Sequence, residues 1–163
     1  MNTSTELNRI RSLVAILRIV LGVILLVTWY DNFTKGLYSA DGITGLFDWI
    51  FNEVGGGPAW YRAVINSTVL AVPGLFGAFQ MVAELALGLG LLFGALTPIA
   101  GLSAAVFFFN LFLSYYGGSE WIWTYVLLTA SAVVVGLAQS GRAFGIDQLL
   151  VQSRGEPPRP MLW

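Results

Sequence analysis

Long apolar runs alternate with short polar connections along the chain, and this pattern predicts membrane-spanning helices. Between Arg62 and Arg142 the only charged residues are Glu84 and Glu120. A helix needs about 20 mostly apolar residues to cross the hydrocarbon core, so this stretch holds about three spans. One more apolar run precedes it. We expect four spans, at about 13–30, 76–96, 99–115 and 121–137.

The segment before the second span can be read in two ways. A single helix over residues 59–96 would be about 57 Å long, nearly twice the thickness of the hydrocarbon core. Pro73-Gly74 is the natural break. The piece before it is short and aromatic, which suits a helix lying at the membrane surface. A five-span chain would instead use this piece as a span.

Composition supports an integral membrane protein. Hydrophobic residues make up 56% of the 163 residues and charged residues only 10%, against about 25% charged in average proteins. A soluble domain this small could not bury so much apolar surface. The net charge of −1 gives no support for binding nucleic acid. The chain contains no Cys and no His, which excludes thiolate nucleophiles, cysteine-ligated clusters and histidine-ligated haem.

Positive charges predict the orientation. Only Lys35 and Arg62 fall on one side of the four spans, and six arginines fall on the other: Arg9, Arg11, Arg18, Arg142, Arg154 and Arg159. The positive-inside rule then places both termini in the cytoplasm of a multi-pass cell-membrane protein. The expected organisation is a cytoplasmic N-terminus (1–12), an all-α four-helix transmembrane bundle (13–141) and a cytoplasmic tail (142–163). The first span lacks a small-residue cleavage site and is read as an uncleaved anchor.

The long external loop, about residues 31–75, is expected to contain one or two short amphipathic helices. One covers about residues 46–54, and Gly55-Gly56-Gly57-Pro58 ends it. Five aromatic residues mark the two helices: Phe47, Trp49, Phe51, Trp60 and Tyr61. The cap they form either anchors the chain at the membrane surface or serves as a lid or docking site for an external partner.

Glu84 is the sharpest candidate for a functional residue, because a carboxylate far from both ends of a span is costly unless it is paired, hydrated or protonated. Gln80 is one helical turn away on the same face. Asn110 lies at a similar depth in the third span, and Tyr115 lies above it. If the second and third helices are antiparallel neighbours, these side chains share a polar pocket. The alternative is that Glu84 and Asn110 only hold helices together by hydrogen bonds.

Two basic residues flank the membrane. Arg18 is five residues into the first span and is expected to reach back to the inner surface, where it contacts anionic lipid or the region of Asp147. A direct bridge to Glu84 is not expected, since it would cross about 10 Å of depth. Lys35 follows Asp31 by four residues, so the two can pair on a continuing helix. Lys35 could instead bind an anion. No metal-ligand set is visible.

Several short motifs together resemble the DoxX/DoxD-like family of four-helix membrane proteins, over about residues 13–150. They are Leu17-Arg18-x-x-x-Gly22, Lys35-Gly36-Leu37-Tyr38, Glu84-Leu85-x-Leu87-Gly88-x-Gly90, Thr97-Pro98, Trp121-x-Trp123-x-Tyr125 and Gly141-Arg142-x-x-Gly145-Ile146-Asp147. One branch of the family implies a function, the membrane subunit of thiosulfate:quinone oxidoreductase. Other members are accessory subunits. This chain departs from the pattern at Thr28-Trp29-Tyr30-Asp31, where a glycine is often found.

The resemblance and the polar pocket lead to two main hypotheses. In the first, the chain is a subunit of a quinone-linked oxidoreductase complex that passes electrons from an external donor to membrane quinone. Glu84 is then the proton acceptor, Gln80 lines the site, and Asn110 or Tyr115 donates a hydrogen bond to the quinone carbonyl. Without Cys to carry the sulfur covalently, electron transfer needs a second subunit or a bound cofactor. In the second, the chain is a noncatalytic assembly subunit of a larger redox complex. A small transporter has less support, because no inverted repeat is visible.

Overall fold

The computed structural model describes residues 3–155, and the regular structure in this range is helical throughout. Residues 1–2 and the proline-rich end of the expected tail, residues 156–163, lie outside the described residues. The elements follow in the order α1 (Thr3–Thr34), α2 (Ala40–Asp48), the π-helical turn η1 (Trp49–Glu53), α3 (Ala59–Ser67), α4 (Pro73–Phe93), α5 (Thr97–Tyr115), α6 (Trp123–Leu137), the 3₁₀ turn η2 (Ser140–Arg142) and α7 (Ile146–Arg154).

Among the described residues, three helices are long and apolar enough to cross a membrane: α1 over Arg9–Thr34, α4 and α5. Helix α6 is also apolar but has only 15 residues, which gives about 22 Å at 1.5 Å per residue. The predicted class, an all-helical membrane bundle, is confirmed. Helix α3, in the segment that a five-span chain would use, has nine residues and is too short to span.

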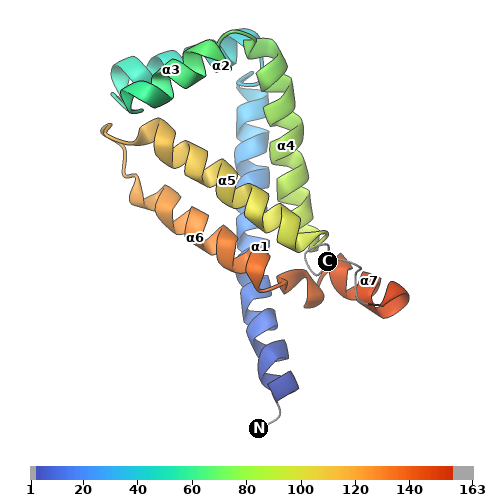
Figure 1. Ribbon diagram of the computed structural model, residues 1–163. Helices are drawn as coiled ribbons and strands as arrows, with labels where there is room; N and C mark the ends of the chain where they lie inside the picture. Colours follow the sequence, from blue (N-terminus) through green and yellow to red (C-terminus); the bar gives the residue numbers. More distant parts are fainter. Residues whose placement is uncertain (1–2, 156–163) are drawn as a thin grey trace.

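The long helices pack as two pairs, α1 with α4 and α5 with α6 (Figure 1). Glycines allow both pairs to approach closely. A Cβ on Gly22 of α1 would lie 2.6 Å from the backbone nitrogen of Leu92 on α4, and a Cβ on Gly101 of α5 would lie 2.6 Å from that of Gly136 on α6. The second and third spans, α4 and α5, therefore each have another helix as their main neighbour, and the condition stated for a shared pocket is met only in part.

Helices α4 and α5 meet only near the turn that joins them. Pro73 starts α4, where its missing N–H costs nothing, and Gly94 ends it with φ +65°. Leu96 follows with φ +48°, and α5 begins at Thr97. From this turn the two helices diverge (Figure 1). Their wide end is covered by α2, η1 and α3, which we call the cap.

The cap has an apolar core of its own. The buried residues of this core include Ile43, Phe47, Ile50, Tyr61 and Ile65, together with Val69, which follows α3. Ser39 caps α2 by accepting a hydrogen bond from the backbone N–H of Gly42 at 3.0 Å. The two short helices expected in the loop are thus present, and the first begins at Ala40, earlier than expected.

Arg18 and Asp147 are fully buried together at the end opposite the cap, which we call the tail end. Arg18 donates a hydrogen bond to the Phe144 carbonyl at 3.0 Å and interacts electrostatically with Asp147. The Asp147 carboxylate accepts hydrogen bonds from the backbone N–H groups of Leu96 (2.7 Å) and Thr97 (2.8 Å). Asp147 therefore caps α5, and we call these residues the Arg18–Asp147 cluster.

The position of Arg18 corrects the expectation that it reaches the membrane surface and contacts lipid. The segment from η2 to α7 packs against the middle of α1 and encloses the guanidinium. Gly94 and Gly145 make room for it, because a Cβ on Gly145 would lie 2.6 Å from the Arg18 Nη1 atom and a Cβ on Gly94 would collide with it. The Arg18 side chain instead lies near Asp147, which was the other position expected for it.

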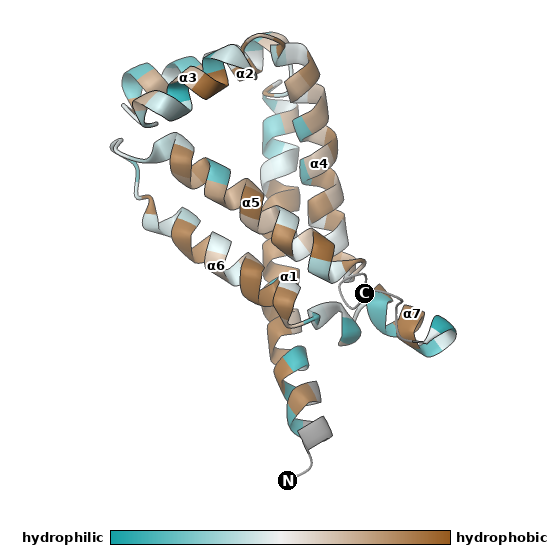
Figure 2. Cartoon of the chain, viewed as in Figure 1, coloured by the Kyte–Doolittle hydropathy of each residue, from teal (hydrophilic) through white to brown (hydrophobic). Residues whose placement is uncertain are grey.

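Hydropathy follows this arrangement (Figure 2). The middle of α1 and most of α4, α5 and α6 are hydrophobic, while the first turns of α1 and much of α7 are hydrophilic. Many large apolar side chains on the long helices are exposed. In a membrane these side chains contact lipid, which is the environment the composition predicts.

Candidate functional site

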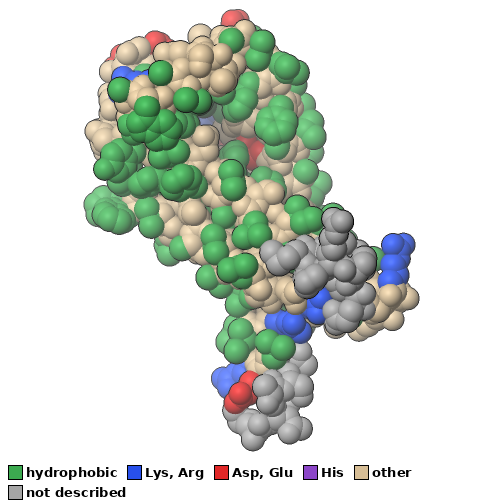
Figure 3. Space-filling model, viewed as in Figure 1, with side chains coloured by type: hydrophobic (Ala, Val, Ile, Leu, Met, Phe, Trp, Pro, Cys, Tyr) green, Lys and Arg blue, Asp and Glu red, His purple; other side chains and the backbone are tan. Residues whose placement is uncertain are grey.

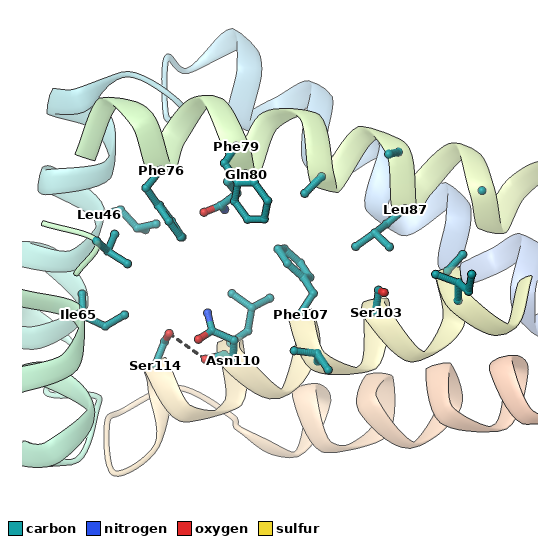
Figure 4. Close-up of a pocket in the computed structure, with 18 of the residues that line it drawn as sticks. Leu46, Ile65, Phe76, Phe79, Gln80, Leu87, Ser103, Phe107, Asn110 and Ser114 are labelled. Carbon is teal, nitrogen blue, oxygen red and sulfur yellow. Dashed lines mark hydrogen bonds between the residues drawn. The ribbon is translucent and has the colours of Figure 1, made fainter. Parts of the chain in front are cut away.

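The divergence of α4 and α5 leaves a cavity of about 740 Å³ under the cap. Figure 4 shows side chains from both helices and from the cap pointing into it. Its walls are mainly apolar: Phe76, Phe79 and Leu87 on α4, Phe107 and Leu111 on α5, and Leu46 and Ile65 on the cap. Volumes of about 300–1,000 Å³ with few polar groups are typical of sites for small molecules. We call this space the main cavity.

The main cavity opens sideways between α4 and α5. Two of its lining side chains are largely exposed, Phe79 at 67% on α4 and Val106 at 70% on α5. Figure 3 shows this face hollowed between hydrophobic side chains. Val106 is near the middle of α5. In a bilayer this mouth faces lipid tails, so an apolar molecule can enter without crossing water.

Asn110 is the best-positioned polar side chain in the main cavity. Tyr61 of α3 donates a hydrogen bond to its Oδ1 atom at 3.0 Å. The Tyr61 hydroxyl also lies 2.7 Å from the hydroxyl of Ser114. Because Oδ1 is engaged, the amide NH₂ group is left to face the cavity, as Figure 4 shows. Tyr61 thereby fixes the orientation of a hydrogen-bond donor.

Gln80 lines the main cavity opposite Asn110, as expected, but Glu84 does not (Figure 4). Gln80 also lines a second cavity of about 260 Å³, and Glu84 lines this one. The reason is the rotation of α4. Its face with Gln80, Ala83 and Leu87 borders the main cavity, whereas Glu84 is among the buried residues of the helix with Gly77, Gly88 and Leu91. Gln80 lies between the two spaces.

Glu84 is fully buried and is held by a tyrosine from the loop after α1. The Tyr38 hydroxyl donates a hydrogen bond to the Oε2 atom at 2.8 Å. Asn32 and Gln80 also interact with the carboxyl. Burial, together with the nearby Glu84 carboxyl, raises the pKa of Tyr38, so the phenol stays protonated and acts as donor. The expected amide neighbours of Glu84 thus include Gln80 but not Asn110.

Tyr115 lines both cavities. Its ring stacks on Tyr125 of α6, with centroids 5.2 Å apart, and meets the edge of Trp49 from the cap at 6.3 Å. These contacts join the end of α5 to α6 and to the cap. The ring is therefore part of the wall between the two cavities.

Lys35 lies outside both cavities. It pairs with Asp31 at 2.6 Å on the exposed surface, in the geometry expected from their spacing. Within residues 3–155 no cluster of acidic residues, His or Cys is arranged to hold a metal ion.

Tyr38, Asn32 and Tyr61 are site residues that sequence reasoning did not assign. Tyr38 stood in a family motif but was given no role, because nothing local shows that the loop returns over α4. Gly77 permits this return: a Cβ there would collide with the Tyr38 carbonyl. The sequence signal that could have identified this pair is a tyrosine two residues after a turn glycine, Gly36, followed later in the chain by a single acidic residue within a span.

Comparison with known protein families gives a match that covers most of the helices. Residues 13–117 match the model of the family described as DoxX. The matched range is more than half of the chain and runs from α1 through the cap to the residues just after α5, so it includes Arg18, Glu84 and Asn110. No curated protein and no solved structure matches this chain.

Proposed function

The chain belongs to the DoxX family, and from this premise and the geometry of the main cavity we propose that it is the quinone-binding membrane subunit of an oxidoreductase complex. The observation that carries the proposal is a large apolar cavity with a mouth toward lipid and an oriented amide donor inside. Such a site suits a molecule that is dissolved in the bilayer and carries a small polar head.

The residues present fit a quinone. Its isoprenoid chain needs apolar volume, which the part of the cavity near the α4–α5 turn supplies through Gly90, Ala95, Leu96, Ile99 and Ala100. Its ring is flat and has carbonyl oxygens that accept hydrogen bonds. The Asn110 amide, fixed by Tyr61, provides a donor in the half of the cavity nearer the cap. The head therefore lies toward the cap and the chain toward the tail end.

The chain's own residues have separate tasks in this proposal. Asn110 orients the ring, and Gln80 borders both the ring site and the space around Glu84. Glu84 exchanges the protons that accompany the redox reaction, and Tyr38 positions its carboxyl. A bound quinone supplies the two-electron redox chemistry. Because the chain has no Cys and no His, the electrons come from a partner redox subunit.

The arrangement of charges suggests the orientation in the cell membrane. Positive charges are more numerous toward the tail end than at the cap end. The tail-end set is Arg9, Arg11, Arg142 and Arg154, and the cap-end set is Lys35 and Arg62. By the positive-inside rule the tail end faces the cytoplasm and the cap faces outward. An external electron donor or its subunit would then meet the cap.

Filling the main cavity is expected to abolish quinone binding. Ala86 is exposed on α4 and lines the cavity, so Ala86→Trp places an indole in the space. We expect the amount of quinone that copurifies with the protein in lipid nanodiscs to fall at least about tenfold, equivalent to about 1.4 kcal/mol of binding free energy. The measurement is extraction and mass spectrometry of the bound quinone.

The matched control is Ala78→Trp. Ala78 is also exposed on α4 but lines neither cavity, so it adds the same indole to the lipid-facing surface. This variant should retain quinone at the wild-type level. Equal retention by both variants would show that the main cavity is not where quinone binds.

An assembly subunit without a reaction is the second candidate. It is favoured by exposed aromatic side chains at the cap end: Trp60 at 58%, Trp121 at 73% and Trp123 at 59%. Exposed tryptophans suit the membrane interface and equally suit a protein partner. Purification in mild detergent separates the candidates, because a complex that keeps its full quinone reductase activity after this chain is removed needs it only for assembly.

A further inference from the structure

The second cavity differs from the main cavity in chemistry. It lies between α1, α4, α5 and α6 in the half of the bundle nearer the cap, and polar side chains from all four helices border it. Together these residues are Thr28, Asn32, Gln80, Glu84, Tyr115 and Tyr125. Only Gln80 and Tyr115 of this set also border the main cavity.

One oxygen of the buried acid is incompletely satisfied by protein. Tyr38 donates to Oε2 at 2.8 Å, but within residues 3–155 no side chain or backbone group makes a well-formed hydrogen bond to Oε1. Buried polar atoms nearly always have a partner from protein or from ordered water. A space of about 260 Å³ holds several water molecules at about 30 Å³ each.

The second cavity also has its own opening. Thr28 is exposed and Asn32 is half-buried, and the two lie one turn apart on the last turns of α1. Ile24, one turn further along, is 38% exposed. This opening lies on the other side of Gln80 and Phe107 from the lipid-facing mouth of the main cavity. It is near the end of α1, where the membrane meets water.

From these observations we propose that the second cavity is a water chamber that connects Glu84 to the cap side of the membrane. The protein then has two separate routes to one site: an apolar route between α4 and α5 for the carrier, and a hydrated route past Thr28 and Asn32 for protons. Gln80, Phe107 and Tyr115 line both cavities and belong to the wall between them.

The chamber gives Glu84 a path for protons to the water side. Oxidation of a reduced carrier releases two protons, and the Glu84 carboxylate takes each in turn across the boundary where Gln80 and Tyr115 line both cavities, becoming a neutral acid. It then passes that proton to chamber water and returns to the carboxylate, and the electrons leave to the redox partner. Quinone reduction runs the same steps in reverse. This proton path rests on the proposed function, whereas the presence of water in the chamber does not.

The absence of Cys from the chain makes the test direct, because a single introduced thiol is the only one present. A hydrophilic methanethiosulfonate reagent reacts with the thiolate, which forms only where water reaches it. Thr28→Cys and Leu128→Cys place the thiol at the chamber. Val27→Cys is the matched control, since Val27 is 63% exposed, lies at the same depth and lines neither cavity.

We expect both chamber thiols to react at least about tenfold faster than the Val27 position in ligand-free protein in nanodiscs, because an apolar environment raises the thiol pKa and so lowers the fraction of reactive thiolate. Chamber thiols that react no faster than Val27→Cys would overturn the proposal. Protection of Thr28→Cys by sodium ions, but not by a larger cation, would also overturn it by showing a cation site in place of water.

A second measurement tests the proton path. Leu128→Phe narrows the chamber but does not change the lining of the main cavity. It should therefore lower the rate of quinone reduction in the assembled complex at least about tenfold, which corresponds to about 1.4 kcal/mol of activation free energy, without weakening quinone binding. A normal rate would contradict the path. If the wild-type chain binds no quinone, the proposed function fails while the thiol result still decides whether the chamber is wet.

Discussion

Replacing Asp147 by alanine is expected to destabilise the protein by about 3–5 kcal/mol, the usual cost of leaving a buried charge without compensation. Arg18 and Asp147 are both fully buried. The substitution leaves the Arg18 guanidinium without its compensating charge. It also leaves the backbone N–H groups of Leu96 and Thr97 without the acceptors that they now contact at 2.7 and 2.8 Å.

The turn between α4 and α5 adds to this cost. Leu96 has φ +48°, an unfavourable conformation for a residue with a side chain, and such strain persists only where its surroundings hold it. Asp147 is what holds it. The main cavity depends on the angle at this turn, so we expect Asp147→Ala to widen or collapse the cavity as well as to lower stability.

Unfolding in mixed micelles with increasing dodecyl sulfate measures the free energy of unfolding. Arg154→Ala is the matched control, because Arg154 is exposed at the end of α7 and its loss should change the stability by less than about 0.5 kcal/mol. Asp147→Asn keeps an oxygen acceptor but removes the charge and should fall between the two. An Asp147→Ala protein as stable as the Arg154→Ala protein would mean that the cluster contributes no stability.

The second large effect is expected for Glu84→Gln in the assembled complex. We expect quinone reduction to slow by about 10²–10⁴-fold, the range that a positioned general acid–base group contributes. Glutamine has the same size and retains an oxygen that can accept the Tyr38 hydrogen bond, so the helix packing around position 84 is preserved. Only the ability to exchange a proton is lost.

Two readouts separate proton exchange from a structural role of Glu84. The stability and the quinone content of Glu84→Gln should match those of the wild type, while its turnover falls. Tyr38→Phe removes the 2.8 Å hydrogen bond but keeps the acid, so it should reduce turnover by a smaller factor. Turnover at the wild-type rate in Glu84→Gln would assign Glu84 to helix packing alone.

The helical spans were predictable because each depends on a local property, the apolar length of a segment. Pro73 and Gly94 mark the ends of α4 and are visible in the sequence. The pairing of helices was not predictable in the same way. The second and third spans were considered as neighbours, but the contacts of Gly22 with α4 and of Gly101 with α6 hold the helices in other pairs.

The candidate site was predictable as a set of residue types but not as an arrangement. Depth along the helices predicted one pocket shared by Glu84, Gln80 and Asn110, and of these only Gln80 and Asn110 line the main cavity. The same argument could not show that Glu84 faces α1, because that depends on which helix occupies the neighbouring position. Arg18 was expected at the surface since an isolated helix would let it extend there. The returning segment with Phe144 and Asp147 encloses it, and no local pattern describes a contact between residues 126 positions apart.

The central claim is that a quinone occupies the main cavity with its ring near Asn110, and photoaffinity labelling tests this most directly. A quinone with a photoreactive group on its ring is irradiated with the protein in nanodiscs, and labelled residues are located by mass spectrometry. We predict labels on α4 around Gln80 and on α5 around Asn110, removed by excess unlabelled quinone and absent from Ala86→Trp. Labels confined to lipid-facing residues such as Val27, or labels that unlabelled quinone does not displace, would contradict the account.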